Sequence, residues 1–162
     1  MSNPDKDVPA HAQTDDFVAR YLREEAAYRE LAARLDPANK AVLFDALSTN
    51  GVSQAVVTFD GYGDSGQIED IDARAGDDKI DLPDLSVTLT LARSGSTEPV
   101  TKIMSLAEAI ESMAYDFLER THPGWELNNG ADGEFVFDVA SRTITLDYNE
   151  RYTASNNFDY EF

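Results

Sequence analysis

The sequence has no cysteine and only two histidines, His11 and His122, in 162 residues. The absence of cysteine excludes disulfides, zinc–thiolate sites and thiol chemistry, and it fits a cytoplasmic protein. Two histidines are too few for a histidine-rich metal site. Apolar runs are only a few residues long, whereas a membrane helix needs about 20 apolar residues, so we expect no membrane span. The polar N-terminal segment predicts no signal peptide.

Basic residues are also scarce, because 13 Lys and Arg stand against 31 Asp and Glu, for a net charge of −18. The acids are clustered: residues 60–84 carry −7 and residues 126–162 carry −6. Such a field repels nucleic acids and anionic lipids and attracts cationic surfaces. The composition therefore argues against direct nucleic-acid or membrane binding and favours a basic protein surface as partner.

The length predicts one domain that buries enough surface to fold without cross-links. Residues 1–13 are polar and show no hydrophobic periodicity, which predicts a disordered tail. We expect a single domain over residues 14–152. Residues 153–162 then form a C-terminal acidic and aromatic tail.

Helix signals occupy the N-terminal third and one later segment. Thr14 followed by two aspartates is typical of a helix start, and Asp36-Pro37 is typical of a second start. We therefore expect an N-terminal helical pair that ends at Asn50-Gly51. Ser105 and Glu108 have the spacing of a capping box in front of an amphipathic helix.

Strand patterns cover the remaining segments. Residues 52–60 are rich in β-branched side chains and predict a buried strand, with 67–72 as its partner and the intervening glycines as turn residues. Residues 86–92 alternate apolar and hydroxyl side chains, which extends these strands into a meander over 52–92, and residues 134–148 predict a hairpin. The expected fold is α+β: an N-terminal helical pair and an antiparallel sheet with one amphipathic helix packed on it.

The stretch from Phe59 to Asp81 resembles a ligand-binding loop in its spacing of Asp and Gly. If Asp60 begins an EF-hand, the required glycine and the final glutamate are out of register. A different calcium site formed by Asp60, Asp64 and Glu69 stays open as an alternative. The glycines also match GxGxxG, but a strand-like acidic segment follows where a nucleotide site needs a helix. We therefore expect a hairpin loop, with no cofactor and no metal.

Catalytic groups are hard to assemble from this sequence. His122 follows the amphipathic helix, where capping of the last carbonyls is favoured over a role as a base. No serine lies in a GxSxG elbow, so a Ser-His-Asp set would depend on His122 alone. Carboxylate pairs are so abundant that they identify no acid–base site. We expect no catalytic residue.

The acid clusters fit a binding surface. Residues i and i+2 of a strand lie on one face about 6.6 Å apart, so Asp70 with Asp72, and Glu134 with Asp138, would form rows. Such rows suit the cationic groove of a protein that handles nucleic acid, while the alternative that the acids only confer solubility stays open. The predicted partner-binding residues are Asp60, Asp64, Glu69, Asp70, Asp72, Asp77, Asp78, Glu134, Asp138 and Asp147.

Two segments carry a resemblance, GYGDSGQIE at 61–69 and YDFLERTHPGWELNNGADGEFVFDVASRTITLDYNERY at 115–152. They resemble an uncharacterised family of small acidic proteins carried on bacterial plasmids, integrative elements and prophages, over about residues 50–152. The resemblance implies no catalytic residue, because the family has no established activity. It implies mobile-element cargo, which often includes acidic anti-defence proteins that mimic nucleic acid.

We therefore expect a cytoplasmic, non-enzymatic protein that binds and inhibits a basic nucleic-acid-handling partner, namely a nuclease or a CRISPR or restriction effector. Anti-CRISPR and anti-restriction activity are the two forms of this expectation. A toxin-neutralising immunity protein is the alternative, because it would share the acidity. A carboxylate-based enzyme or a calcium-binding module is the second alternative.

Overall fold

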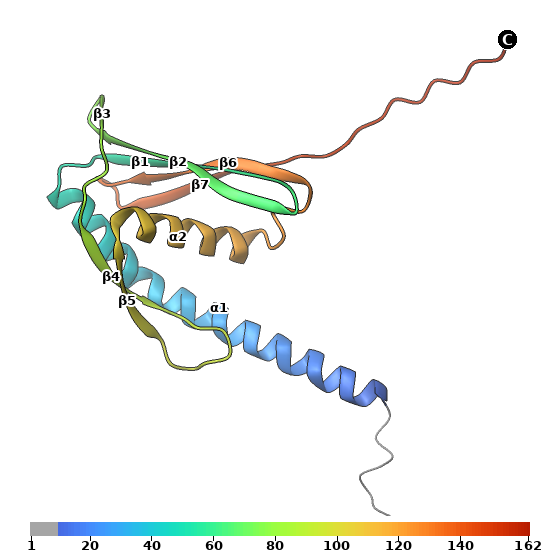
Figure 1. Ribbon diagram of the computed structural model, residues 1–162, viewed down its shortest axis with the longest axis horizontal. Coiled ribbons are helices and arrows are strands. Elements are labelled where there is room, and N and C mark those ends of the chain that lie inside the picture. The colour runs from blue at the N-terminus through green and yellow to red at the C-terminus, as the bar shows by residue number, and fades with distance from the viewer. Residues whose placement is uncertain (1–9) are drawn as a thin grey trace, which may run out of the picture. The chain divides into compact units, whose positions relative to one another are not determined.

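The computed structural model describes residues 10–162, with side-chain surroundings from residue 14 onward. These residues form an α+β fold, as predicted (Figure 1). The elements are α1 (Ala10–Thr49), β1 (Gln54–Gly63), β2 (Ser65–Ala75), β3 (Asp78–Ile80), β4 (Ser86–Leu91), β5 (Val100–Ser105), α2 (Leu106–Thr121), β6 (Asn128–Asp138) and β7 (Thr143–Glu150). Most of the predicted disordered tail, residues 1–9, lies outside the described residues.

Contacts divide the chain into two compact units. Among the described residues, the first comprises residues 10–39 together with Thr88–Lys102, and the second comprises Lys40–Val87 and Ile103–Phe162. Helix α1 and strands β4 and β5 contribute residues to both units. The single domain predicted over residues 14–152 stays a prediction.

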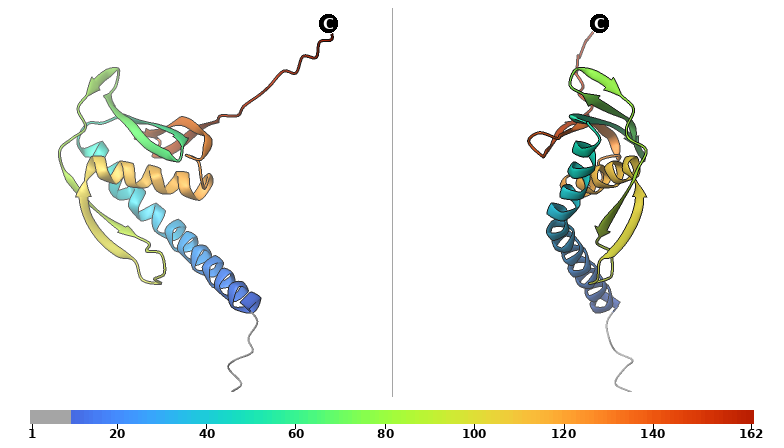
Figure 2. Two further views of the ribbon diagram at one scale, coloured as in Figure 1. Left: turned by 45° about the vertical axis from the view of Figure 1, so that its right-hand side comes forward. Right: turned by 90° about the vertical axis from the view of Figure 1, so that its left-hand side faces the viewer.

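The second unit is built on an antiparallel five-stranded sheet in the order β3-β2-β1-β6-β7. The register sets Val57 of β1 beside Ile71 of β2 and Phe135 of β6, so these three side chains point to one face. Helix α2 covers that face (Figures 1 and 2). The fully buried side chains of this unit include Leu43, Phe44, Leu47, Val57, Phe59, Leu106, Ile110, Leu118, Phe135 and Phe137. The predicted helix-on-sheet packing is thus confirmed.

The first unit joins helix α1 to the β4–β5 ribbon through a buried polar side chain. The amide of Asn39 donates to the carbonyl of Thr90 at 2.8 Å, and its oxygen accepts from the Thr90 N–H at 3.0 Å. Both bonds are made to the backbone of β4, so the Asn39 side chain satisfies the hydrogen-bonding groups that a neighbouring strand would otherwise satisfy.

Helix α1 is continuous through Asp36-Pro37, so the predicted helical pair is wrong in this detail. Proline removes one backbone donor from the helix. Burial on both sides of Pro37 outweighs that loss, since Ala32 is buried before it and Asn39 and Leu43 are buried after it. The helix also begins at Ala10, before the predicted start at Thr14.

The predicted end of α1 is confirmed. The helix stops at Thr49, Gly51 has a φ of 77°, and the N–H of Val52 donates to the carbonyl of Leu47 at 3.0 Å. A left-handed glycine with this returning hydrogen bond is a common helix C-terminus. Helix α2 also begins as predicted, because the Ser105 hydroxyl accepts from the N–H of Glu108 at 3.1 Å.

The meander predicted over residues 52–92 is wrong in its last strand. Strand β4 pairs with β5 in a separate two-stranded sheet, while β1 and β2 belong to the five-stranded one. Strand β5 was not predicted, because VTKIMS lacks regular alternation and its pairing arises only when residues 94–97 form the loop before it. Residues 94–97 lie in the loop between β4 and β5.

Candidate functional site

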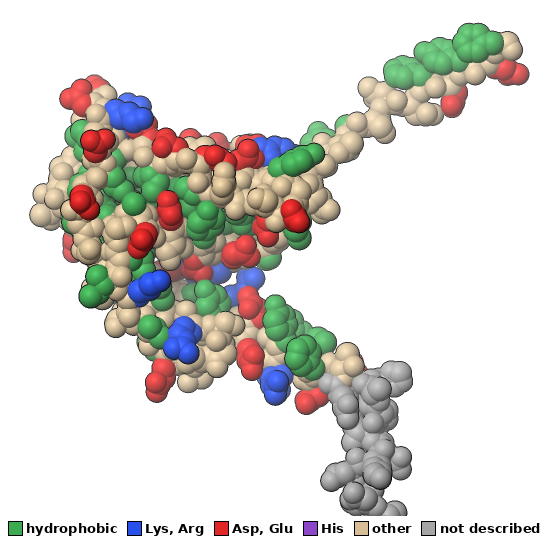
Figure 3. All heavy atoms as spheres, in the orientation of Figure 1, with side chains coloured by type: hydrophobic (Ala, Val, Ile, Leu, Met, Phe, Trp, Pro, Cys, Tyr) green, Lys and Arg blue, Asp and Glu red, His purple; other side chains and the backbone are tan. Residues whose placement is uncertain are grey.

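The sheet face turned away from α2 carries rows of carboxylates. Asp70 and Glu134 flank Thr58 of β1 on its two sides, and Glu134 is paired in turn with Asp147 of β7. These side chains form a central row across four strands. We call the whole surface the acidic face, and its members are Asp60, Asp70, Asp72, Asp132, Glu134, Asp138 and Asp147. Figure 3 shows red side chains along this side of the sheet.

Arginines pair with the carboxylates on either side of the central row. Arg151 binds Asp60 and Asp132, each at 2.7 Å, and also donates to the carbonyl of Gly61 at 2.9 Å. The hydrogen bond to Asp60 is the main cause that raises the pKa of Arg151 above its ordinary value. On the other side, Arg74 lies 3.1 Å from Asp72. The fold therefore neutralises part of the acidic face internally, on both sides of the central row.

The central row itself is exposed to solvent. Asp70, Glu134 and Asp147 all have exposed side chains. Neighbouring strands are about 4.8 Å apart, so Glu134 and Asp147 lie close enough to repel each other. Two charges about 6 Å apart in water repel by roughly 0.7 kcal/mol, and a cationic partner would remove this cost. The carboxylates of the central row are therefore accessible to a partner, and they repel one another.

The predicted partner-binding residues divide between this face and its ends. Those on the face are Asp60, Asp70, Asp72, Glu134, Asp138 and Asp147. Glu69 lies in the irregular register of β2, where it accepts from the side chain of Gln67 at 3.1 Å. Asp64 lies between β1 and β2, and Asp77 and Asp78 lie where β2 turns into β3. Members of both acid clusters thus meet on one surface.

Asp132 belongs to the acidic face but was not among the predicted residues. It pairs with Asp60 of β1, so it lies on the same face as Glu134, two residues further along β6. In ADGEF (residues 131–135), acidic residues alternate with small or apolar ones, and this alternation was the sequence signal for a strand with Asp132 on its outer face. The glycines around Asp132 hid it, because they resemble a turn more than a strand.

Asp138 also has a structural role at the β6–β7 turn. Its carboxylate accepts from the backbone N–H and from the hydroxyl of Ser141, both at 3.0 Å. These bonds, the backbone one first, lower the pKa of Asp138 below its ordinary value of 3.8. Asp138 is therefore the member of the face whose charge also stabilises a turn.

The glycines of the β1–β2 hairpin lie mostly within the strands. Gly61 pairs with Gly66, and only Gly63, with a φ of 73°, occupies the turn itself. A Cβ atom on Gly66 would lie 2.4 Å from Cη2 of Trp125, and one on Gly61 would lie 2.7 Å from Cζ3. The expectation that all three are turn residues is corrected: Gly61 and Gly66 leave room for the buried indole of Trp125.

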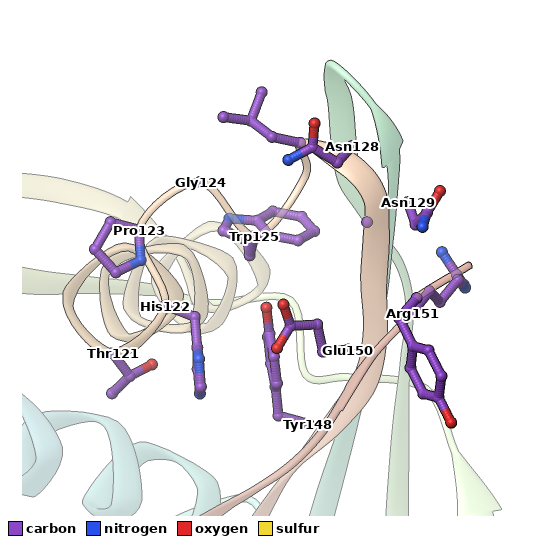
Figure 4. Close-up of a pocket in the computed structure, with 13 residues that line it drawn as sticks. Thr121, His122, Pro123, Gly124, Trp125, Asn128, Asn129, Tyr148, Glu150 and Arg151 are labelled. Atoms are coloured by element: carbon purple, nitrogen blue, oxygen red, sulfur yellow. The ribbon is translucent and has the colours of Figure 1, made fainter. Parts of the chain in front are cut away.

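A hollow of about 540 Å³ lies where the end of α2, the start of β6 and the end of β7 meet (Figure 4). The ring of His122 stacks on Tyr148 with centroids 3.6 Å apart, and Glu150 also lines the hollow. Burial, followed by the charges of Glu150 and Glu126, raises the pKa of the Tyr148 phenol. The backbone N–H of His122 donates to the carbonyl of Leu118 at 2.7 Å, so His122 ends α2 as predicted.

The alternative calcium site is not assembled. Asp60 is paired with Arg151, and Glu69 is engaged by Gln67. Across residues 10–162 no group of three or more His, Asp or Glu side chains is placed to hold a metal ion. Nor is either helix in that range long and apolar enough to cross a membrane.

These features define a class: small acidic α+β proteins whose antiparallel sheet packs a helix on one face and presents carboxylates on the other. The chain belongs to the family of unknown function DUF6878, whose model matches residues 35–162. This confirms the resemblance to an uncharacterised family and extends it beyond residues 50–152 at both ends. No curated protein and no solved structure matches the chain significantly.

Proposed function

We propose that this protein is a non-enzymatic inhibitor whose acidic face binds a basic, nucleic-acid-binding surface of another protein. The observation that carries the proposal is the central row of Asp70, Glu134 and Asp147, exposed on a sheet whose other face packs against α2. An array of like charges on paired strands suits a groove built for phosphates, because the backbone that carries it does not have to be ordered on binding.

The clustering of its carboxylates distinguishes the acidic face from surface acids that only keep a protein soluble. Dispersed charges of both signs are enough to keep a small domain soluble. Residues 14–35, by contrast, contain five acids and four arginines, so the chain does not carry its excess of acids everywhere. The acidic face instead gathers seven carboxylates from β1, β2, β6 and β7. Local repulsion makes such clustering costly unless a partner offsets it.

The partner we propose is a nuclease or a CRISPR or restriction effector. Its cationic groove would be occupied by the acidic face, so that nucleic acid is excluded by competition. Long-range attraction between the charges would speed association at low salt. The choice of these enzymes rests on the charge and on the mobile-element setting that the resemblance implies.

The test compares two triple variants that remove equal charge. The face variant is Asp70→Asn, Glu134→Gln, Asp147→Asn, and the matched control is Asp81→Asn, Asp84→Asn, Glu119→Gln. Each removes three negative charges from −18, and all six side chains are exposed. Asp72 is left intact because it is half-buried and paired with Arg74.

Each protein is immobilised and used to capture partners from host lysate at low salt, with identification by mass spectrometry. We expect wild type and control to enrich a basic nucleic-acid-handling protein and to inhibit its purified activity, and the face variant to lose at least about tenfold in affinity. Binding should weaken as salt rises. Equal binding by the face variant, or capture that is insensitive to salt, would refute the proposal.

The alternatives make different predictions in the same experiments. An immunity protein would capture a toxin made by its own producer cell. A carboxylate-based enzyme would use the hollow, where His122 and Glu150 lie together, and His122→Ala with Glu150→Gln would then abolish function while the face variant retained it. A calcium-binding module would show a higher melting temperature with calcium than with magnesium.

A further inference from the structure

The hollow between the end of α2, the start of β6 and the end of β7 has polar groups in its wall that form no hydrogen bond with the described part of the chain (Figure 4). Glu150 and Asn128 both line it, and neither side chain has a hydrogen bond or an ion pair to another described residue. The phenol of Tyr148 has no hydrogen-bond partner there either. A few polar groups that converge on one hollow are what a ligand site requires.

Tyr148 is held in place by aromatic contacts. Its ring stacks on that of His122 with centroids 3.6 Å apart, and the centroid of Phe59 lies 6.2 Å away. Figure 4 shows the oxygen end of Tyr148 next to the carboxylate of Glu150. Burial, and then the charges of Glu150 and Glu126, raise the pKa of this phenol. At neutral pH the phenol is therefore protonated and lies in the field of two carboxylates.

The charge around the hollow selects a cation. Arg151 is the only Lys or Arg among the described residues that line it, and its guanidinium is already bound by Asp60 and Asp132, each at 2.7 Å. Two carboxylates more than neutralise that arginine, while Glu150 has no cationic partner in the described chain. Oε2 of Glu126 is also buried there without a hydrogen-bond partner. An anion would be repelled, and a neutral ligand would leave the charge of Glu150 uncompensated.

The acceptors suit a guanidinium group better than an ammonium group. A guanidinium carries five N–H donors in a planar fork and pairs with a carboxylate through two parallel hydrogen bonds. The carboxylate of Glu150, the phenol oxygen of Tyr148 and the amide oxygen of Asn128 can all accept from it. Arg151 shows such binding nearby, because two carboxylates and the carbonyl of Gly61 hold its guanidinium. The volume of about 540 Å³ exceeds that of one arginine side chain.

We propose that the hollow binds the guanidinium group of an arginine that the basic partner inserts into it. The hollow adjoins the acidic face, because Arg151 lines the hollow and also binds Asp60 and Asp132 of that face. One partner can therefore contact both. Arginines that enter pockets are among the residues that dominate the affinity of protein interfaces. The source of the arginine rests on the proposed function, whereas recognition of a guanidinium rests on the hollow itself.

Titration with N-acetyl-arginine amide tests the recognition without any partner. Trp125 is the only tryptophan of the chain and lines the hollow, so its fluorescence reports binding. Amide NMR shifts at Gly130 and Arg151, which also line the hollow, locate the bound probe. We expect saturable binding at about 150 mM NaCl. N-acetyl-citrulline amide has nearly the same shape without the charge and should bind at least about tenfold more weakly. N-acetyl-lysine amide should also bind more weakly.

The hollow variant is Tyr148→Phe with Glu150→Gln. It removes the phenol oxygen and one charge but keeps the ring that stacks on His122, and it should bind the arginine probe at least about tenfold more weakly. The control Glu98→Gln removes one charge from an exposed side chain of the first unit and should bind the probe as wild type does. Equal binding by the hollow variant, or equal binding of the citrulline or lysine probe, overturns the inference.

Capture of the partner separates this inference from the proposed function. We expect the hollow variant to hold the partner at least about tenfold more weakly, and Glu98→Gln to hold it as wild type does. If the face variant loses the partner while the hollow variant keeps it, the proposed function stands and the partner's arginine is excluded as the occupant. If wild type captures no basic protein, the proposed function fails, and the titration still decides whether the hollow recognises guanidinium.

Discussion

Replacing Gly66 by alanine tests whether the hairpin glycines exist to accommodate Trp125. The added methyl would lie 2.4 Å from Cη2 of the indole and 2.8 Å from Cβ of Glu126, closer than carbon atoms approach. The indole is buried and packs edge-on against Phe59 with centroids 5.6 Å apart, so it has little room to withdraw. Either the hairpin or the ring must shift.

The expected cost follows from overpacking. Inserting a methyl into a well-packed core costs about 1–3 kcal/mol, which in a chain of this size lowers the melting temperature by on the order of 5 °C. Gly63→Ala is a useful contrast, because its Cβ would meet nothing within 4 Å and its φ of 73° makes the cost one of backbone strain. That strain is about 1–2 kcal/mol and should not depend on Trp125.

A double-mutant cycle separates the two causes. Trp125→Phe removes the outer ring atoms that the Gly66 methyl would meet, so Gly66→Ala should cost at least about 1 kcal/mol less in that background. Gly63→Ala should cost the same in both backgrounds. Urea unfolding followed by far-UV circular dichroism gives all the free energies. An equal cost of Gly66→Ala with and without the indole would refute this account of the glycines.

Two further predictions concern single polar contacts. The hydrogen bonds from Ser141 lower the pKa of Asp138, so the stability that this carboxylate confers is present above 3.8 and is lost as pH falls through the lower folded value. Ser141→Ala should raise the pKa of Asp138 towards 3.8 in a carboxyl NMR titration, and an unchanged pKa would contradict this. Asn39→Ala removes two part-buried hydrogen bonds to the N–H and C=O of Thr90 and should cost about 0.5–1.5 kcal/mol for each. Urea unfolding and faster hydrogen exchange at Thr90 measure it, with exposed Asn50→Ala as the control for a lost asparagine.

Local interactions explain what could be predicted from the sequence. The C-terminal end of α1 near Gly51 and the start of α2 at Ser105 depend on residues within one helical turn, and both were predicted correctly. The predicted break of the N-terminal helix at Pro37 was wrong, because contacts between distant segments opposed a local preference. Its local preference is real, but burial of Asn39 and Leu43, which depends on segments distant in the sequence, outweighs it.

For the candidate site, too, local patterns predicted one part and contacts between distant segments decided the rest. Asp70 with Asp72 could be placed on one face from their spacing alone, and so could Glu134 with Asp138. That these two pairs share a surface depends on β1 pairing with both β2 and β6, and no local pattern encodes that register. The ion pairs of Arg151 with Asp60 and Asp132 could not be predicted, because they exist only once those strands have paired.

The sequence by itself determined the α+β class, the C-terminal end of α1, the start of α2, the clustered acidity and the membership of an uncharacterised family. These follow from composition, from periodicity and from contacts within a few residues. Only the tertiary structure decided that two acid clusters join on one sheet face, that Gly61 and Gly66 adjoin an indole, and that the end of α2 meets β6 and β7 around a hollow. Each of these is a relation between segments far apart in the chain, and such relations are set by packing and strand register.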